Sequence, residues 1–487
     1  MITIGKLQLL ILAMATLCWS STFGQTSTPS NLTYEQALSL STQNNPTLRI
    51  AADNFDAAKR ERGSLRSTWF PQISAAGAYT HMSNYIGLHQ KLDVYTNPIK
   101  DALLQLFPDI QLGPEILDFI GSQTLEYPLI ERNFATIDVN LMWPVFTGGK
   151  RLFADKIGRS TVEGASIDLS IAKASVTTTL VERYFGLRLY KKISEIRKQS
   201  LESITQHYNQ ALSLSKNGML NRAELLYAQL SKDEAEREYE TSLKNLSVIE
   251  SALKTTLGSD SLATINPTTP MFMLASLPPL TYFDGQAESN SYIIQQIDSK
   301  RNITKQLNNV EKSAYFPNIA FVARQNLYSY QLSRYVFPRT MLGVGFTWTL
   351  FDGLARERNI SKTRIIYQST ATLRDKATKD INLGIKELYT KMVNAHNELS
   401  TIITSQQLAQ ELVKVRSSSF KEGMATSTEV VDAQLMLAKV DIAFMQAFYQ
   451  YDLALIQLCS LCGIPDQFDI FRTEGITELQ VQQQGLK

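Results

Sequence analysis

The sequence WPVFTGGK at residues 143–150 is followed 205 positions later by WTLFDGLA at residues 348–355. Both stretches place a tryptophan, a phenylalanine and a glycine at the same spacing. The same offset, without a gap, relates the residues that follow, as far as Gly258 and Gly463. Other pairs at this offset are Gly218-Met219 with Gly423-Met424, Glu224 with Glu429, and Ala228-Gln229-Leu230 with Ala433-Gln434-Leu435. So long a match in one register predicts two copies of one structural unit.

Upstream, the two copies align at a larger offset of 246, which relates FPQI at residues 70–73 to FPNI at residues 316–319. The difference predicts an insertion of about 41 residues in the first copy, between Tyr79 and Phe134. We expect a first repeat at residues 25–258, with this insertion near residues 80–134, and a second repeat at residues 291–463. Residues 259–290, which hold four prolines, are expected to link the repeats, and residues 464–487 to form a C-terminal tail.

The first residues are typical of a secretory signal peptide. Lys6 precedes an apolar stretch at residues 7–19, which is too short for a membrane-spanning helix. Small residues near Gly24 place the expected cleavage before Gln25, so residues 1–24 are predicted to be the signal peptide. Leu17 stands where a lipoprotein signal needs a small residue, which argues against lipidation of Cys18. We therefore expect an exported protein.

Two long proline-free stretches, residues 145–266 and 339–464, predict long helices. In each copy we expect a long helix, a tight turn at a glycine and a shorter helix. At about 1.5 Å per residue, residues 150–215 would run about 100 Å and residues 221–257 about 55 Å. Residues 34–69 are expected to form another, shorter helical region.

Within the second proline-free stretch, apolar side chains recur at alternating steps of four and three, at Ile381, Ile385, Leu388, Met392, Ala395, Leu399 and Ile402. The first copy keeps this pattern in part, at Val176, Leu180, Leu187 and Tyr190. A heptad repeat of this kind indicates helices packed along their length as a coiled coil. A filament or an adhesin stalk would explain the pattern equally well.

Just before each long helix, apolar residues alternate with small or polar ones, at residues 137–145 and 342–350. This period of two over about ten residues is typical of a transmembrane β-strand, and tryptophans suit the membrane interface. Weaker partner strands are expected at residues 72–82 and 318–330. A half-buried strand of a soluble sandwich alternates in the same way, so the membrane interpretation depends on the export signal and the projecting helices.

Four such strands cannot form a barrel alone. Every backbone N–H and C=O must be paired in lipid, and known barrels begin at about eight strands. A closed barrel therefore needs several chains, and three copies would supply twelve strands.

Several of these stretches resemble motifs of the TolC family of outer-membrane efflux proteins. They are residues 143–150, residues 348–355, the two Phe-Pro-x-Ile stretches and GMATSTEVVDAQ at residues 423–434. The motifs occur in order and in duplicate over nearly the whole mature chain. The resemblance implies an α+β membrane protein that forms a homotrimer. Its twelve-stranded β-barrel, with four strands per chain, would continue into a long periplasmic α-helical coiled-coil barrel.

The resemblance also implies a function and its partners. The trimer would be a passive exit duct of a tripartite efflux pump or type I secretion system, embedded in outer-membrane lipid. A periplasmic adaptor protein and an inner-membrane transporter would dock at the tip of the helical barrel. The alternative is a trimeric structural or adhesive outer-membrane protein with a coiled-coil stalk, although such a protein would carry its anchor strands together at one end.

By the same resemblance, the turn residues Gly218, Met219, Gly423 and Met424 are expected at the periplasmic tip, where the adaptor binds. Glu224, Glu429 and Asp432 are expected at the pore entrance, where acidic rings would favour cations. Asn221-x-x-Glu224 and Thr426-x-x-Glu429 also fit a capping box, so helix capping is an equally good explanation for the two glutamates. Asp432 lies one turn further, where capping does not explain it.

The chain departs from those members that close the entrance with an aromatic and a basic residue beside the turn glycine. Phe420 and Ala425 stand at these places, without a hydroxyl group or a positive charge. A comparable closure would have to be weaker or built elsewhere.

No stretch of the sequence predicts catalysis. Cys459 and Cys462 have CxxC spacing, but no second pair or nearby histidine completes a metal site, so buried structural thiols are expected. The four histidines are scattered, and no phosphate loop or nucleophile elbow is present. A net charge of +2 gives no case for nucleic-acid binding. We expect no cofactor, no metal and no enzymatic activity.

The insertion is expected on the outer face, because it lies at the strand ends opposite the long helices. Its apolar middle at residues 99–120 is interrupted by Pro108 and Pro114. We hypothesise that it folds over the outer mouth. A tolerated surface loop is an equally good explanation.

Overall fold

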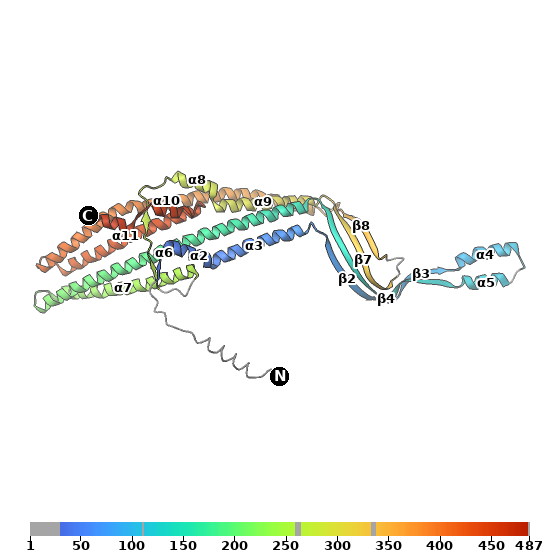
Figure 1. Ribbon diagram of the computed structural model, residues 1–487, viewed down its shortest axis with the longest axis horizontal. Helices are drawn as coiled ribbons and strands as arrows, with labels where there is room; N and C mark the ends of the chain where they lie inside the picture. The colour runs from blue at the N-terminus through green and yellow to red at the C-terminus, as the bar shows by residue number, and fades with distance from the viewer. Residues whose placement is uncertain (1–29, 110–111, 259–263, 333–337, 486–487) are drawn as a thin grey trace, which may run out of the picture. The chain divides into compact units, whose positions relative to one another are not determined.

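The computed structural model describes residues 30–109, 112–258, 264–332 and 338–485 (Figure 1). The predicted signal peptide at residues 1–24, with its cleavage site, lies outside these residues. The chain divides into two units, which we describe separately. Unit 1 contains residues up to Asn54, residues 166–296 and residues 375 onward, and unit 2 contains Phe55–Ala165 and Ile297–Arg374.

The helices come in pairs of matched length. α2 (Tyr34–Asn44) and α8 (Leu280–Asn290) have 11 residues each, and α3 (Pro46–Ser67) and α9 (Tyr292–Ser313) have 22. α6 (Lys150–Lys216) and α10 (Ala355–Lys421) both have 67 residues, and α7 (Arg222–Leu257) and α11 (Ser427–Leu461) have 36 and 35. The predicted long helical hairpins are confirmed. The predicted helical region at residues 34–69 is two helices, because Asn45 leaves the helical conformation before Pro46.

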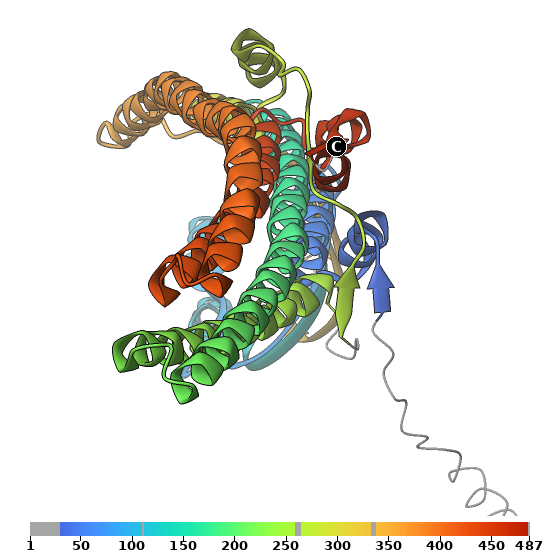
Figure 2. The ribbon, with the colours of Figure 1, turned by 90° about the vertical axis from the view of Figure 1, so that its left-hand side faces the viewer.

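The core of unit 1 lies along the two long hairpins, α6–α7 and α10–α11. Figure 2 looks toward the turns of both hairpins, with α6–α7 in green and α10–α11 in orange and red. The heptad positions Ile381, Ile385, Met392 and Ala395 are buried, and Leu388, Leu399 and Ile402 pack against the same core. In the first copy, Leu180 and Leu187 belong to this core. The expected lengthwise helix packing is therefore present within one chain.

The predicted linker and tail are more structured than the sequence suggested. Residues 259–290 include β5 (Ile265–Pro267), β6 (Phe272–Met273) and the whole of α8, and the tail includes α12 (Gln467–Glu474), β9 (Ile476–Thr477) and α13 (Glu478–Gly485). Pro279 stands at the N-cap of α8, where a proline is compatible with the start of a helix. β5 pairs with β1 (Ser30–Leu32), and β6 pairs with β9.

A buried ion pair joins the tail to α6. The Arg188 Nε donates to the Glu478 carboxylate over 2.7 Å, and an Arg188 Nη1 donates to the Pro267 carbonyl over 3.2 Å. Both side chains are almost fully buried. The second Glu478 oxygen accepts from the Met271 N–H, so β6 and the tail are tied to the same point of the core. Removing one partner of such a pair would leave a buried, uncompensated charge.

Unit 2 contains one sheet with strand order β2-β4-β7-β8. Its strands are β2 (Gln72–His81), β4 (Thr124–Thr147), β7 (Asn318–Leu332) and β8 (Thr340–Thr347), paired antiparallel. All four predicted strands are present. Within the described residues, the outer edges of β2 and β8 have no strand partner, so the sheet is open at both sides.

The prediction of four strands per chain is nevertheless incomplete. A fifth strand, β3 (Ile86–Lys91), pairs with the first part of β4, and the insertion also contains α4 (Asp93–Leu106) and α5 (Leu112–Gly121). The expected insertion near residues 80–134 is thus partly a continuation of the sheet. The sequence hid this because Pro128 and charged residues interrupt the alternation at the start of β4.

The corner between strand and long helix is built twice in the same way. The indole N–H of Trp143 donates to the Trp69 carbonyl, and that of Trp348 to the Tyr315 carbonyl, over 3.0 and 3.1 Å. Arg151 donates to the Val145 carbonyl near the end of β4, and Arg356 donates to the Leu350 carbonyl just after β8. Each guanidinium also lies over the ring of its neighbour, Trp69 or Tyr315. Two tryptophans and two arginines therefore fix both corners.

Among the described residues, none of the helices has the length and apolar character that crossing a bilayer requires.

The glycines at two helix ends give a matched stability prediction. Gly463 has φ +77°, and a Cβ there would lie 2.1 Å from the Asn290 carbonyl oxygen. Gly423 has φ +75°, but no atom lies within 4 Å of its Cβ position. Both alanine variants meet left-handed strain of about 1–2 kcal/mol, and Gly463→Ala must also displace the backbone that follows α8. We expect Gly463→Ala to lower the thermal unfolding midpoint, measured by circular dichroism, clearly more than Gly423→Ala. Equal losses would contradict the clash.

Candidate tip of the helical hairpins

The two hairpin turns have the same construction. After α6, the Gly218 N–H donates to the Ser215 carbonyl and the Met219 N–H to the Leu214 carbonyl; after α10, Gly423 and Met424 donate to Phe420 and Ser419. Gly218 and Gly423 have φ of +71° and +75°, in the left-handed region that residues other than glycine rarely adopt. Met219 and Met424 follow them and are 72% and 70% exposed. Each turn therefore presents one methionine to solvent.

Glu429 closes a reciprocal capping box at the start of α11. Its N–H donates to the Thr426 hydroxyl over 3.3 Å, and its carboxylate accepts from the Thr426 N–H over 2.9 Å. The Arg416 guanidinium lies 2.9 Å from the other carboxylate oxygen. The backbone hydrogen bond from Thr426, with Arg416, holds the pKa of this carboxyl below its ordinary value. Glu429 therefore has a capping role and remains charged.

Glu224 does not close the capping box that its spacing predicts. Asn221 caps α7 by accepting from the Glu224 N–H over 2.9 Å. The Glu224 carboxylate instead accepts from the Ser427 N–H, at the first residue of α11, over 3.2 Å. The prediction is wrong because the neighbouring helix start offers a free N–H that the carboxylate can reach. Glu224 thus links the two hairpins.

Asp432 also bonds across the hairpins. The Tyr227 hydroxyl donates to its carboxylate over 3.0 Å. Burial, together with this hydrogen bond, raises the pKa of the Tyr227 phenol. Tyr227 stands 205 positions before Asp432, so the two copies place a donor and an acceptor at equivalent positions. Sequence reasoning missed Tyr227, although this offset could have indicated it.

His207 is the buried centre of the tip and was not predicted. Its side chain is 3% exposed, its Nε2 lies 2.6 Å from the Ser427 hydroxyl, and its ring centroid lies 4.6 Å from that of Phe420. Phe420 packs in one apolar cluster with Ala211, Ala228 and Val430. Burial lowers the pKa of the imidazole, whereas the negative charge of Glu224 acts in the opposite direction. Phe420 of α10 therefore packs on a histidine of α6 and so contacts the other hairpin.

Three polar contacts thus join the hairpins at their ends: Glu224 with Ser427, Tyr227 with Asp432, and His207 with Ser427. All three reach α11 within its first two turns. The structure brings the predicted residues Glu224, Glu429 and Asp432 to one end of unit 1, beside Met219 and Met424. These contacts hold the ends of the two hairpins together.

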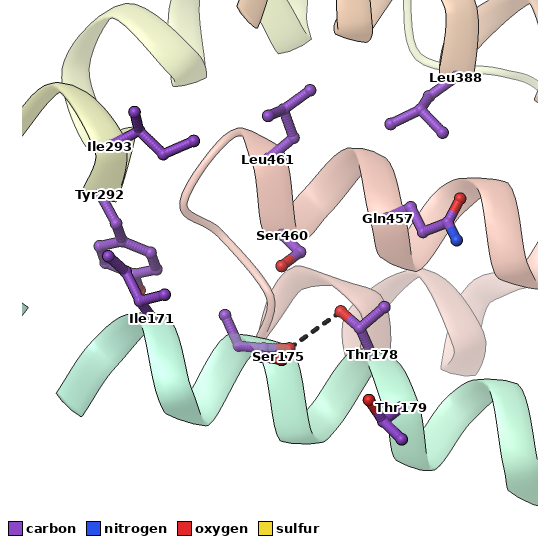
Figure 3. Close-up of a pocket in the computed structure, with 11 residues that line it drawn as sticks. Ile171, Ser175, Thr178, Thr179, Tyr292, Ile293, Leu388, Gln457, Ser460 and Leu461 are labelled. Carbon is purple, nitrogen blue, oxygen red and sulfur yellow. Dashed lines mark hydrogen bonds between the residues drawn. The ribbon is translucent and has the colours of Figure 1, made fainter. Parts of the chain in front are cut away.

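A groove in unit 1 is lined by apolar and uncharged polar side chains. It has a volume of about 420 Å³ and lies in unit 1 between α6, α9, α10 and α11 (Figure 3). Its apolar lining residues include Ile171, Ile293, Leu388 and Leu461. None of its lining residues is charged. Within the part of the chain that the structure describes, no group of histidine, cysteine, aspartate or glutamate side chains could hold a metal.

The two cysteines are buried and unpaired, as expected. The Cys462 thiol donates to the Phe283 carbonyl over 3.4 Å. Burial raises the pKa of both thiols, that of Cys462 to about 12, so neither is a thiolate at neutral pH. The prediction of structural thiols is confirmed.

Known proteins similar to this chain are outer-membrane channels. The sequence model of a family described as "Outer membrane efflux protein" matches residues 37–259 and 285–464. The outer membrane protein VceC of Vibrio cholerae has a TM-score of 0.69 at 14% identity, over 88% of this chain and 96% of that chain. The Campylobacter jejuni CmeC outer membrane channel has a TM-score of 0.69 at 15% identity, over 93% and 94%. The Neisseria gonorrhoeae MtrE outer membrane channel, solved in its open state, scores 0.67 at 12% identity, over 89% of each chain. No curated protein matches the chain.

The buried His207 predicts that the hairpin ends loosen in acid. Its pKa is lowered in the folded protein, so folding favours the neutral imidazole. The contact is complete above the ordinary histidine pKa of about 6.5 and is lost as pH falls through the lowered value. We expect peptides covering residues 424–434 to exchange amide hydrogens faster at pH about 5 than at pH about 7.5, after correction for intrinsic rates. His207→Gln should remove this dependence, whereas His396→Gln, elsewhere on α10, should keep it. The same pH response in His207→Gln would contradict the prediction.

Proposed function

Because this chain belongs to the outer membrane efflux protein family, we propose that it is one protomer of a homotrimeric exit duct in the outer membrane. The duct passes substrates passively from an inner-membrane transporter across the periplasm and the outer membrane. It serves a tripartite efflux pump or a type I secretion system. A periplasmic adaptor protein joins the duct to the transporter, which supplies the energy.

The open sheet of unit 2 is the observation that carries this proposal. Its edge strands β2 and β8 leave backbone N–H and C=O groups without strand partners among the described residues, and an unpaired edge cannot face lipid. Pairing β2 of one copy with β8 of the next removes both edges. With β2, β4, β7 and β8 from each chain, three copies form a twelve-stranded barrel, which is wide enough to leave a lumen.

We also propose that the chain arose by internal duplication and that each half supplies two barrel strands and one long hairpin. The matched helix lengths support this, since α6 and α10 have 67 residues each and begin 205 positions apart. The repeated corner hydrogen bonds of Trp143 and Trp348 support it further. In the trimer, six hairpins form the periplasmic helical barrel.

The tip of unit 1 is the proposed pore entrance. Three copies of Glu224, Glu429 and Asp432 give rings of negative charge, which favour cations. The same carboxylates bind helix-start amides or a tyrosine, so they also set the distance between hairpins. Exposed Met219 and Met424, at the turns of Gly218 and Gly423, form the adaptor contact, because methionine adapts its shape to a partner surface.

The entrance proposal predicts a change in conductance when one contact between hairpins is removed. Tyr227→Phe deletes the hydroxyl that holds Asp432, and an exposed hydrogen bond is worth about 0.5–1.5 kcal/mol. We expect single-channel recordings in planar bilayers to show the open state about two- to tenfold more populated. Tyr239→Phe, on the same helix away from the turn, is the matched control. If both variants conduct like the wild type, the contact does not gate the duct.

The acidic rings are tested in the same recordings. The double variant Glu429→Ala/Asp432→Ala should reduce cation selectivity, because it removes two charges per protomer from the entrance. Unchanged selectivity would leave Glu429 as a helix cap and Asp432 as the acceptor of Tyr227, with no role in the pore. The oligomer is tested first, by light scattering in detergent, where we expect the mass of three chains. A trimer that never conducts would favour the structural or adhesive alternative.

A further inference from the structure

The insertion in unit 2 stands on a two-stranded ribbon that continues the sheet. β2 pairs with β4 from Gln72↔Met142 to His81↔Asn133, and β3 then pairs with β4 from Ile86↔Ile130 to Lys91↔Thr124. The Met82 N–H donates to the Arg132 carbonyl over 2.7 Å between these two ladders. β4 has 24 residues, whereas a strand needs only about 9–11 residues to cross a membrane. Under the proposed function, the ribbon of β3 and early β4 therefore extends outside the barrel.

The ribbon ends in a helical hairpin, α4 and α5 (Figure 1). The hairpin has its own internal contacts: Lys100 forms an ion pair with Asp118, Thr96 is buried, and a Cβ on Gly121 would lie 2.5 Å from the Thr96 hydroxyl. The Leu92 N–H donates to the Gln123 carbonyl over 3.1 Å at its base. The two helices therefore pack closely against each other.

Most apolar side chains of this hairpin are nevertheless exposed. They include Tyr95, Ile99, Leu106, Ile116, Phe119 and Ile120, which are 62%, 56%, 72%, 52%, 69% and 40% exposed. Ile86 and Leu88 on the ribbon are exposed as well. An apolar surface of this kind on both helices indicates a binding partner.

The charges of the hairpin favour a protein partner over a membrane surface. Helices that lie on membranes are rich in lysine and arginine on their polar face. The two helices here contain a single basic residue, Lys100, which is paired, and four acidic residues, Asp93, Asp101, Glu115 and Asp118. The ribbon also raises the hairpin away from the barrel that it leaves.

We propose that the hairpins of the three copies pack on one another and form a helical cap over the outer mouth of the duct. This inference rests on the proposed trimer. The three ribbons rise from one barrel rim because β4 is both a barrel strand and a ribbon strand, so the hairpins meet at the high effective concentration of a tethered system. Their exposed apolar side chains supply the contact, and the second copy is a partner that is always present.

Crosslinking through one added cysteine tests the cap. Phe119→Cys places a thiol on the exposed apolar surface, and Asn97→Cys places one at an exposed polar position of α4 as the control. The native thiols Cys459 and Cys462 are buried and do not interfere. Trimers are first verified by light scattering and then treated with a short bis-maleimide. We expect a covalent dimer with Phe119→Cys and no covalent dimer with Asn97→Cys.

The other outcomes distinguish the alternatives. Verified trimers in which Phe119→Cys reacts freely with a soluble maleimide and forms no dimer overturn the cap while leaving the duct intact. Protection of that thiol only in lipid bilayers, again without a dimer, overturns it in favour of a membrane contact. Absence of a trimer overturns the proposed function and the cap together.

A shortened chain gives a second, independent measurement. Replacing residues 93–122 by Asn-Gly joins Leu92 to Gln123 through a two-residue turn at the existing end of the ribbon. We expect trimers of this variant to conduct more than the wild type. Equal conductance would show that the hairpins leave the mouth open and would overturn the cap.

Discussion

The fold depends on the requirement that every backbone N–H and C=O of a membrane strand be paired. Within the residues that the structure describes, the sheet of β2, β4, β7 and β8 meets this requirement inside and leaves both edges without a strand partner. Under the proposed function, a single chain therefore cannot be the working unit in lipid, and pairing with further copies completes the sheet. The proposed trimer, the lumen and the convergence of six hairpins on one entrance all follow from these two open edges.

The same kind of constraint operates at the hairpin tips, where helix starts leave N–H groups unpaired. The start of α11 receives the Glu429 carboxylate from its own helix and the Glu224 carboxylate from the neighbouring hairpin. In the proposed entrance, pore charge and helix capping are compatible, because Glu429 caps α11 and keeps its negative charge. Tyr227, Asp432 and the buried His207 add contacts that a change in pH or a docking partner can weaken. These contacts join the two hairpins without an aromatic hydroxyl or a basic residue beside the turn glycine.

Under the proposed duplication, the two halves have kept the same geometry at their corners while their hairpin tips differ. The corners keep tryptophan and arginine in both halves, because each must turn a strand into a long helix. At the tips, the equivalent positions hold Tyr227 in one half and Asp432 in the other, which converts a repeat into a complementary pair. The insertion, present only in the first half, gives the proposed trimer three outer hairpins that the second half does not duplicate.

The sequence alone determined the local elements. Proline-free stretches, heptad spacing and alternation predicted the long helices and four strands, because these signals depend on neighbours a few residues apart. Spacing also found the turn glycines and the capping role of Glu429. Only the tertiary structure decided the partners of Glu224, Asp432 and His207, since Ser427 lies 220 residues from His207 and no local pattern encodes that contact. It likewise decided that β3 extends the sheet and that the tail joins β6, because strand pairing and ion pairs depend on residues brought together by folding.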